Sequence, residues 1–197
     1  MILIVGGTGD LGRAVTKRLL AKGQLVRVMT RTPASAADLQ QLGAEIVQGD
    51  LRDPVSLQRA CTDVNQVVVS AHAIFGRGSE ASKNVDLQGH KALIDTAKAA
   101  GVQQFVYISV PDAAPDNVVP FLRFKYEVEQ YLRDSGLTFV ILRAAAFMES
   151  HAHMLIGESI LTKGKVLLFG EKISSSNFVH LTPKTPVAFA PCPVGSL

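Results

Sequence analysis

The stretch Met1-Ile-Leu-Ile-Val-Gly-Gly-Thr-Gly-Asp-Leu-Gly-Arg-Ala14 decides the fold, because in it an apolar run meets a glycine-rich turn that opens into a helical pattern. Ile2 to Val5 predicts a buried strand, and Leu11 to Lys22 predicts the helix that follows it. A strand, a glycine turn and a helix in this order form the unit with which α/β sheets bind the pyrophosphate of a dinucleotide.

The residues of this turn have separate expected tasks. Gly6 lets the chain reverse, Gly9 lets the backbone approach the phosphates, and Gly12 lets the helix pack close to the strand. The N–H groups at the start of the helix and the positive end of its dipole are expected to face the anion. The predicted phosphate-binding turn consists of Gly6, Thr8, Gly9, Asp10, Leu11 and Gly12.

The rest of the chain alternates short β-branched runs with amphipathic stretches, which is typical of βαβ units and a parallel sheet. Six strands are predicted, at residues 2–5, 25–29, 45–48, 65–70, 104–109 and 138–143. This pattern fits an α/β fold with a doubly wound parallel sheet, a Rossmann fold, in the strand order 3-2-1-4-5-6. Ligands are expected at the carboxyl ends of the strands, next to loops such as 71–80 and 110–120.

The composition describes a chain that can bury a sizeable core. Of its 197 residues 47% are hydrophobic and 19% charged, and the net charge of +3 comes from dispersed basic residues, so nucleic-acid binding is not expected. Cys61 and Cys192 follow no metal or redox spacing and indicate a reducing compartment. Because neither a signal peptide nor an apolar run of about 18 residues is seen, we expect a cytoplasmic protein that is not inserted in a membrane.

Several segments taken together resemble one protein family. These segments are Gly6-Gly-Thr-Gly-Asp-Leu-Gly-Arg13, Val26-Arg-Val-Met-Thr-Arg31, Gly49-Asp-Leu51, Asn84-Val-Asp86, Gly101-Val-Gln-Gln-Phe-Val-Tyr-Ile-Ser109 and Ser135-Gly-Leu-Thr-Phe-Val-Ile-Leu-Arg143. Over roughly residues 1–170 the chain is similar to the NmrA-like family of atypical short-chain dehydrogenases/reductases, which includes isoflavone-reductase-like and quinone-reductase-like proteins. The resemblance implies an NAD(P)-binding domain at residues 1–150, followed at 151–197 by a partial substrate-binding region with an irregular tail.

The end of the second predicted strand indicates which dinucleotide is bound. An NAD site usually has an Asp or Glu there, which accepts hydrogen bonds from the ribose 2′-OH, whereas this chain has Thr30 and Arg31. A guanidinium pairs with a 2′-phosphate in a forked geometry, so NADP(H) is favoured over NAD(H). The alternative is that Arg31 is only a solvated arginine at a strand end. The family resemblance implies that Arg13 approaches the same phosphate.

Two further groups of residues are expected at the cofactor. The resemblance implies that Asp50 accepts a hydrogen bond from the adenine amino group and that Leu51 packs on the ring; alternatively, Asp50 only caps the turn that follows. The backbone of Ser70, Ala71 and His72 follows the fourth predicted strand and should line the ribose side of the cleft. His72 itself is better interpreted as a loop histidine than as a catalyst.

The helix predicted at 121–134 bears on catalysis. Typical short-chain reductases carry a Tyr-x-x-x-Lys pair on this helix, where one turn brings both side chains to the same face. Here Phe121 takes the tyrosine position, while Lys125 is retained, as in isoflavone-reductase-like proteins. Lys125 is expected to orient the nicotinamide ribose or to donate a proton, unless it is a surface lysine. Ser109 matches the superfamily serine that binds the substrate carbonyl, or is a structural hydroxyl at a strand end.

Other polar and aromatic residues are expected to have structural roles. His151 and His153 lie on different faces of a helix without a carboxylate or cysteine cluster, so no metal site is predicted. Glu127 and Glu129 are expected to form a solvated helix face. The aromatic residues assigned to the core or to a pocket are Phe105, Tyr107, Phe139 and Phe147.

Two functions from different classes remain open at this point. In the first, the chain is an NADP(H)-binding oxidoreductase that passes hydride to a small carbonyl, quinone or enone substrate without the usual tyrosine. In the second, it is a non-catalytic NADP(H) sensor that acts through a protein partner. The chain departs from the family pattern after about Gly170, so we expect a truncated or altered form whose substrate region is incomplete.

Overall fold

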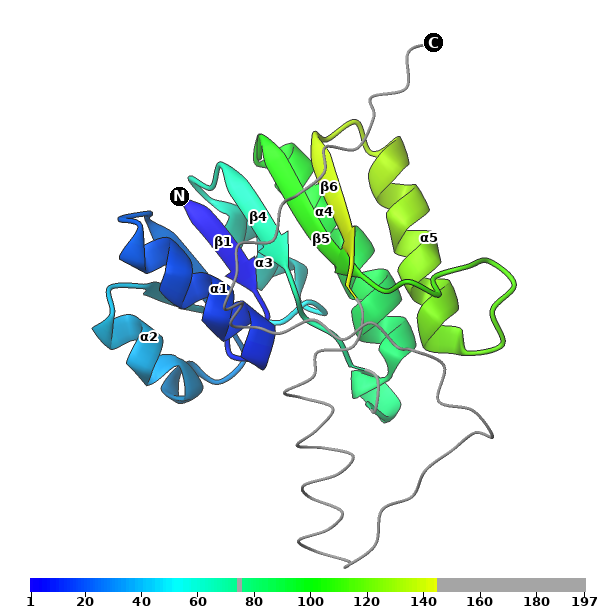
Figure 1. Ribbon diagram of the computed structural model, residues 1–197, viewed down its shortest axis with the longest axis horizontal. Helices are drawn as coiled ribbons and strands as arrows, with labels where there is room; N and C mark the ends of the chain where they lie inside the picture. Colours follow the sequence, from blue (N-terminus) through cyan, green and yellow to red (C-terminus); the bar gives the residue numbers. More distant parts are fainter. Residues whose placement is uncertain (74–75, 145–197) are drawn as a thin grey trace, which may run out of the picture. The chain divides into compact units, whose positions relative to one another are not determined.

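The computed structural model describes residues 1–73 and 76–144, and in these ranges six parallel strands form one sheet (Figure 1). Their order is β3-β2-β1-β4-β5-β6, which confirms the predicted doubly wound Rossmann fold. The strands are β1 Ile2–Val5, β2 Val26–Thr30, β3 Glu45–Gln48, β4 Gln66–Val69, β5 Gln104–Ser109 and β6 Phe139–Arg143. The expectations for Phe147, His151, His153 and the tail fall outside the described residues.

Helices connect the strands, and their bounds follow the sequence signals closely. They are α1 Asp10–Ala21, α2 Ala37–Gln41 after the 3-10 turn η1 Pro33–Ala36, α3 Pro54–Cys61, α4 His90–Ala99 and α5 Pro120–Asp134, with a second 3-10 turn η2 at Gly78–Glu80. Asp53 is the N-cap of α3, and its side chain accepts a hydrogen bond from the Val55 N–H at 3.1 Å. The stretch before α4 is a π-helix, η3 Lys83–Gly89, a form that the periodicity did not predict.

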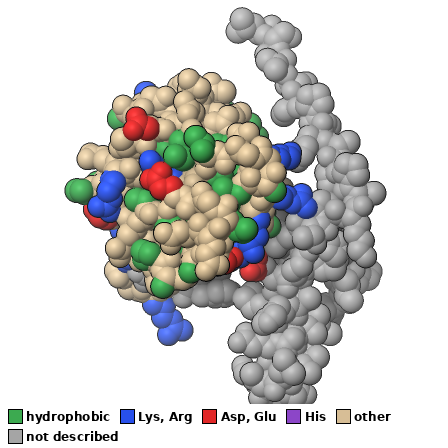
Figure 2. Space-filling view, turned by 90° about the vertical axis from the view of Figure 1, so that its left-hand side faces the viewer, with side chains coloured by type: hydrophobic (Ala, Val, Ile, Leu, Met, Phe, Trp, Pro, Cys, Tyr) green, Lys and Arg blue, Asp and Glu red, His purple; other side chains and the backbone are tan. Residues whose placement is uncertain are grey.

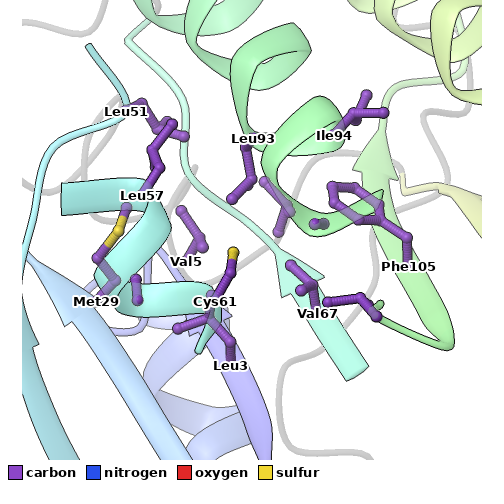
Figure 3. Packing of buried hydrophobic residues seen from close by; sticks show 14 of the residues in the cluster. Leu3, Val5, Met29, Leu51, Leu57, Cys61, Val67, Leu93, Ile94 and Phe105 are labelled. Carbon is purple, nitrogen blue, oxygen red and sulfur yellow. The ribbon is translucent and has the colours of Figure 1, made fainter. Parts of the chain in front are cut away.

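Two hydrophobic layers hold the sheet between its helices. On one face, β1 and β2 pack against α1 and α2 in a cluster centred on Ile4, Val28 and Leu39. On the other face, a larger cluster joins the strands to α3, α4 and α5 (Figure 3). Members of this larger cluster that are labelled in the figure include Leu3, Val5, Leu57, Cys61, Val67, Leu93, Ile94 and Phe105. Both layers fix the strand register from inside the protein.

The register places three strand ends at one edge of the sheet. Val5 at the end of β1 pairs with Met29 of β2 and with Val69 of β4. The loops that follow these strands therefore start side by side, although they are far apart in the sequence. In doubly wound sheets this edge, beside the point where the strand order reverses, is the usual place for a ligand.

The prediction of a solvated helix face is correct for Glu127 and wrong for Glu129. Glu129 is 0% exposed, whereas Glu127 is exposed. The reason is that Arg143 of β6 donates to the Glu129 carboxylate at 2.9 and 2.7 Å and Arg133 donates at 3.4 Å. These guanidinium groups supply the charge that lets a carboxylate lie between α5 and β6.

The described surface carries both signs of charge. On the face shown in Figure 2, basic, acidic and hydrophobic side chains are scattered and intermixed. Within residues 1–73 and 76–144, no helix combines the length and the apolar character needed to cross a bilayer.

Candidate functional site

The glycine turn after β1 has the close backbone contacts that its sequence predicted. Gly6 has φ +87°, and a Cβ at this residue would lie 2.5 Å from the Ala71 nitrogen. A Cβ at Gly12 would lie 2.1 Å from the Gly6 carbonyl oxygen, so α1 starts in contact with the turn itself. At Gly9 the nearest such contact is 3.5 Å. A side chain at Gly6 or Gly12 would therefore clash with backbone atoms, so the turn requires glycine at both positions.

The start of α1 is arranged as an anion site. Gly9 is its N-cap residue and brings no side chain to the first turn, while the Arg13 N–H closes the first helical turn on the Gly9 carbonyl at 2.8 Å. The positive end of the helix dipole points to the space in front of Thr8 and Gly9, both of which line a cleft. A phosphate is the group that such a helix start binds best.

This cleft runs along the carboxyl edge of the sheet and has a volume of about 680 Å³, within the range of known ligand sites. Three segments supply most of its wall: the glycine turn, the residues after β2 and the residues after β4. The lining residues are Val5, Gly6, Thr8, Gly9, Met29, Thr30, Arg31, Thr32, Ser35, Gly49, Asp50, Leu51, Ser70, Ala71, His72, Ala73, Gly76 and Val85. The glycine cradle and the extended cleft fit a dinucleotide.

One end of the cleft carries Arg31 together with two hydroxyl residues, Thr32 and Ser35. The sequence interpretation singled out Arg31 and missed the other two, although the hydroxyl of Thr32, close after the end of β2, was a visible signal. Asp50 and Leu51 line the same region. Arg52 binds the Asp50 carboxylate at 2.9 and 2.5 Å, and this hydrogen bond holds the pKa of Asp50 below its usual value.

Arg13 lies beside this end of the cleft and is held by the protein. Its guanidinium forms an ion pair with Asp38 and donates to the Ser35 carbonyl at 2.9 Å and to the Thr8 carbonyl at 3.4 Å. The hydrogen bond from Arg13 lowers the pKa of Asp38 to about 2. The structure therefore connects Arg13 to two residues of the cleft wall, Thr8 and Ser35, while Arg13 is not itself among the described lining residues.

The opposite end of the cleft is formed by the loop after β4. Ser70 ties this loop to the glycine turn, because its hydroxyl bonds the carbonyls of Val5 and Gly6 at 3.3 Å each. Ala71 and His72 follow in the wall. The His72 ring meets the Phe121 ring of α5 edge-on, with centroids 6.4 Å apart, so α5 approaches the cleft at this point.

Lys125 is buried, and the interpretation of it as a surface lysine is wrong. It is 3% exposed, its Nζ donates to the Ile108 carbonyl at 3.2 Å, and its ammonium lies 4.8 Å from the centre of the Tyr107 ring. Burial lowers the pKa of Lys125 to about 8, while Asp86 and Glu129 act in the opposite direction. An amine with this pKa exchanges its proton near neutral pH, which suits it to proton transfer.

Ser109 faces the same interior as Lys125. It is 1% exposed, and its hydroxyl makes no hydrogen bond of normal geometry with the described residues. It lies beside the Glu129 carboxylate, whose pKa it helps to lower. Neither Ser109 nor Lys125 is among the described residues that line the cleft.

The sequence interpretation did not identify the polar cluster around Lys125. Asp86 of η3 and His90 of α4 are 0% and 1% exposed, and the His90 ring packs edge-on against Tyr107 at 5.4 Å. Asp86 was visible only as part of a family segment, and no spacing in the sequence links it to a lysine on another helix. Across the described parts of the chain, no group of His, Cys, Asp and Glu side chains is suited to a metal ion.

Comparison with known proteins finds relatives over most of this chain. It is 35% identical to the photosystem II assembly factor Ycf39 of Cyanophora paradoxa over 157 residues, which are 80% of this chain and 47% of that protein. It is 33% identical to the NAD(P)H azoreductase of Xenophilus azovorans over 166 residues, 84% of this chain and 54% of that protein. The chain thus spans about half the length of the curated relatives that it matches.

Solved structures agree with the fold. The NADPH complex of the Escherichia coli NADPH-dependent quinone oxidoreductase has a TM-score of 0.64 and 27% identity, over 81% of this chain and 55% of that one. An Agrobacterium tumefaciens short-chain dehydrogenase/reductase superfamily protein with bound NAD has a TM-score of 0.66 and 27% identity, over 83% of this chain and 54% of that one. Residues 6–177 match the NAD(P)H-binding family, and the chain belongs to it.

Proposed function

We propose that the chain binds NADP(H) in the cleft and, as part of the protein, reduces a small carbonyl, quinone or enone substrate by hydride transfer. The observation that carries the choice of dinucleotide is Arg31 in the cleft wall, with Thr32 and Ser35 beside it. A guanidinium and two hydroxyls are the donors that a 2′-phosphate needs. The carboxylate in the turn after the neighbouring strand β3, Asp50, is bound by Arg52.

In this proposal, different groups of residues bind different parts of the cofactor. The glycine turn and the start of α1 hold the pyrophosphate, Asp50 and Leu51 contact the adenine, and the loop from Ser70 to His72 lines the ribose side. The bound cofactor supplies the hydride. Lys125 orients the ribose or gives a proton to the reduced substrate, and its lowered pKa serves the second task. Ser109 remains a candidate for contact with the substrate oxygen.

The test is oxidation of NADPH in the presence of a panel of quinones, enones, aldehydes and azo dyes. We expect NADPH consumption that depends on the acceptor and is abolished by Lys125→Ala, while Lys91→Ala retains it, since Lys91 pairs with Glu127 on the outer side of α4 and α5. Consumption that is equally fast in Lys125→Ala would remove Lys125 from the mechanism. No turnover with any member of the panel, despite binding, would argue against the reductase.

A second candidate function is a dinucleotide sensor that acts through a protein partner. Two observations favour it: Phe121, which has no ionisable proton, stands at the tyrosine position, and relatives include photosystem II assembly factors. This function is supported if NADPH and NADP⁺ both bind and no member of the acceptor panel is reduced. The cytoplasmic location stays a prediction; one relative, from Arabidopsis thaliana, is described as chloroplastic.

A further inference from the structure

The lysine assigned to the reaction lies in an interior that contains several other ionisable groups. They face Lys125 from every element packed around it and comprise His72 after β4, Asp86 of η3, His90 of α4, Tyr107 of β5 and Glu129 of α5. A buried ammonium is costly unless a negative group nearby compensates its charge. Only a group that is itself negatively charged can compensate Lys125 in this way.

The two histidines and the tyrosine do not supply negative charge. Burial, and then Lys125, lower the pKa of His90 to about 3, so its ring is neutral at pH 7. The same two causes lower the pKa of His72, although this residue is partly exposed to solvent. Burial raises the pKa of Tyr107 far above its ordinary value, so the phenol is neutral as well.

Glu129 is negative, but its charge is matched elsewhere. Arg143 binds both of its carboxylate oxygens, at 2.9 and 2.7 Å, and Arg133 adds a contact at 3.4 Å. A carboxylate held by two guanidinium groups acts less strongly on a third cation, and Glu129 raises the pKa of Lys125 less than Asp86 does.

Asp86 is held in a different way. Its carboxylate accepts hydrogen bonds from the Ala73 N–H at 3.1 and 3.3 Å and from the Ser82 hydroxyl at 2.7 Å, and both donors are neutral. No described cation lies within ion-pair distance of it, so its charge acts at longer range.

The helix η3, which carries Asp86, packs against α5, which carries Lys125, and both side chains are buried. The Tyr107 ring lies 4.8 Å from the Lys125 ammonium and also contacts the ring of His90, whose Nδ1 bonds the Asp86 carbonyl. The carboxylate and the ammonium therefore share one interior of low polarity, in which charges act over a longer range.

We propose that Asp86 is a positioning residue that supplies the counter-charge of Lys125 and, through the Ala73 N–H, ties that charge to the wall of the cleft. Ala73 lines the cleft next to His72, so one carboxylate links the loop after β4 to the lysine of α5. The effect of Asp86 on turnover rests on the proposed function, whereas the electrostatic coupling between Asp86 and Lys125 does not.

His90 reinforces this arrangement. Its Nδ1 lies 2.9 Å from the Asp86 carbonyl oxygen, which can only accept, so the proton of the neutral ring is on Nδ1. This hydrogen bond joins the π-helix to α4 at the residue that carries the carboxylate. The backbone of Asp86 is therefore fixed independently of its side chain.

The experiment measures the titration of Lys125 without cofactor. The protein is labelled with ¹³C-lysine, the side-chain resonance of Lys125 is identified by its loss in Lys125→Met, and its shift is followed across the neutral and alkaline range. In Asp86→Asn, which keeps the shape and the acceptor for Ala73, we expect the midpoint to fall by about one pH unit or more. In Ser82→Ala, which removes a hydrogen bond to the same carboxylate but no charge, we expect the midpoint to stay close to that of the parent.

Equal midpoints in the parent and in Asp86→Asn would overturn the proposal and leave Asp86 as a structural cap of the loop. Should Asp86→Asn be too unstable to titrate, a double-mutant cycle decides instead. Lys125→Met alone leaves an uncompensated buried carboxylate, so adding Asp86→Asn to it should raise the urea midpoint or cost far less than in the parent. Additive losses would contradict the coupling. Absence of NADPH turnover would change neither result, since both measurements are made without cofactor.

Discussion

Arg31 is the residue on which the proposed preference for NADP(H) depends, because it places a guanidinium in the cleft wall directly after β2. We expect Arg31→Glu to weaken NADPH binding by about tenfold or more, since a charge-assisted hydrogen bond is lost and repulsion is added. NADH binding should change little or improve. Calorimetric titration measures both.

The matched control for this substitution is Arg18→Glu, the same change of charge on the exposed side of α1. Screening reduces its influence on the cleft at physiological salt. If Arg18→Glu lowered NADPH affinity as much as Arg31→Glu, the effect would be one of net charge, and Arg31 would have no special role.

Lys125 leads to a prediction about pH and stability. Its pKa falls from 10.5 to about 8 in the fold, so burying the protonated form costs about 3 kcal/mol. Below about pH 8 the lysine is protonated in both states and the full cost applies. Between about pH 8 and 10.5 the unfolded chain holds more protons than the folded one, so this group makes the free energy of unfolding rise with pH.

Cys61 acts in the opposite direction over part of this window, because burial raises its pKa from 9.0 to about 11. Urea unfolding should therefore be compared between the parent and Lys125→Met, both of which contain Cys61. The parent should gain stability relative to the variant as the pH rises from 8 to 10.5. A constant difference across this range would show that Lys125 titrates at an ordinary lysine pKa.

At the scale of elements, two glycines at the start of α1 are expected to affect different properties: Gly12 the stability of the fold and Gly9 the affinity for the cofactor. A methyl group at Gly12 would lie 2.1 Å from a backbone oxygen that cannot move away, so Gly12→Ala should cost about 1–3 kcal/mol of unfolding free energy or more. A methyl group at Gly9 would have its nearest contact at 3.5 Å, and Gly9 lines the cleft where the proposed function places the pyrophosphate. Gly9→Ala should therefore cost much less stability than Gly12→Ala, limited to the poorer N-cap, and should lose NADPH affinity.

Urea unfolding and cofactor titration of these two variants test this division. Equal losses of stability would mean that Gly9 is also packed against the turn. Unchanged NADPH affinity in a folded Gly9→Ala variant would place the pyrophosphate elsewhere.

The contact between α5 and β6 depends on Glu129, which sequence periodicity placed in solvent. Burial opposes ionisation of Glu129, but the hydrogen bonds from Arg143 outweigh it, and the pKa lies below its ordinary value of 4.5. Glu129→Gln should lower the free energy of unfolding by about 1–3 kcal/mol at neutral pH. The loss should shrink as the pH falls through the native pKa, because the parent then protonates the same group.

Glu127→Gln on the same helix is the control, since Glu127 is exposed and has only a 3.7 Å contact with Lys91. Its unfolding free energy should stay within about 0.5 kcal/mol of the parent. A loss as large as that of Glu129→Gln would contradict a special role for the buried carboxylate.

These two glutamates show where sequence interpretation succeeds and where it stops. Strands, helices and their order follow from local periodicity and from glycines such as Gly6 and Gly12, so the fold was predictable. The polarity of one helix face cannot reveal that Arg143, on a strand reached later in the chain, neutralises Glu129. For the same reason the sequence identified Lys125 but not Asp86, since only the packing of η3 against α5 brings their charges together.

At the scale of the whole molecule, parallel strand register assembles the site from distant segments. The glycine turn, the residues after β2 and the loop after β4 meet at one edge because β1 lies between β2 and β4. The wall of the cleft is thus made mainly by the turns and loops that follow the central strands of the sheet. Relatives match this chain over about half of their own length, yet one is a photosystem II assembly factor and another an NAD(P)H azoreductase.

The most direct test of the central claim is calorimetric titration of the unmutated chain with NADPH, NADP⁺, NADH and NAD⁺ under one set of conditions. The cleft, the glycine turn and Arg31 predict that NADPH and NADP⁺ bind, and that each binds at least about tenfold more tightly than its counterpart without the 2′-phosphate. Equal affinity for NADPH and NADH would contradict the role given to Arg31. Failure of all four dinucleotides to bind the folded chain would contradict the assignment of the cleft.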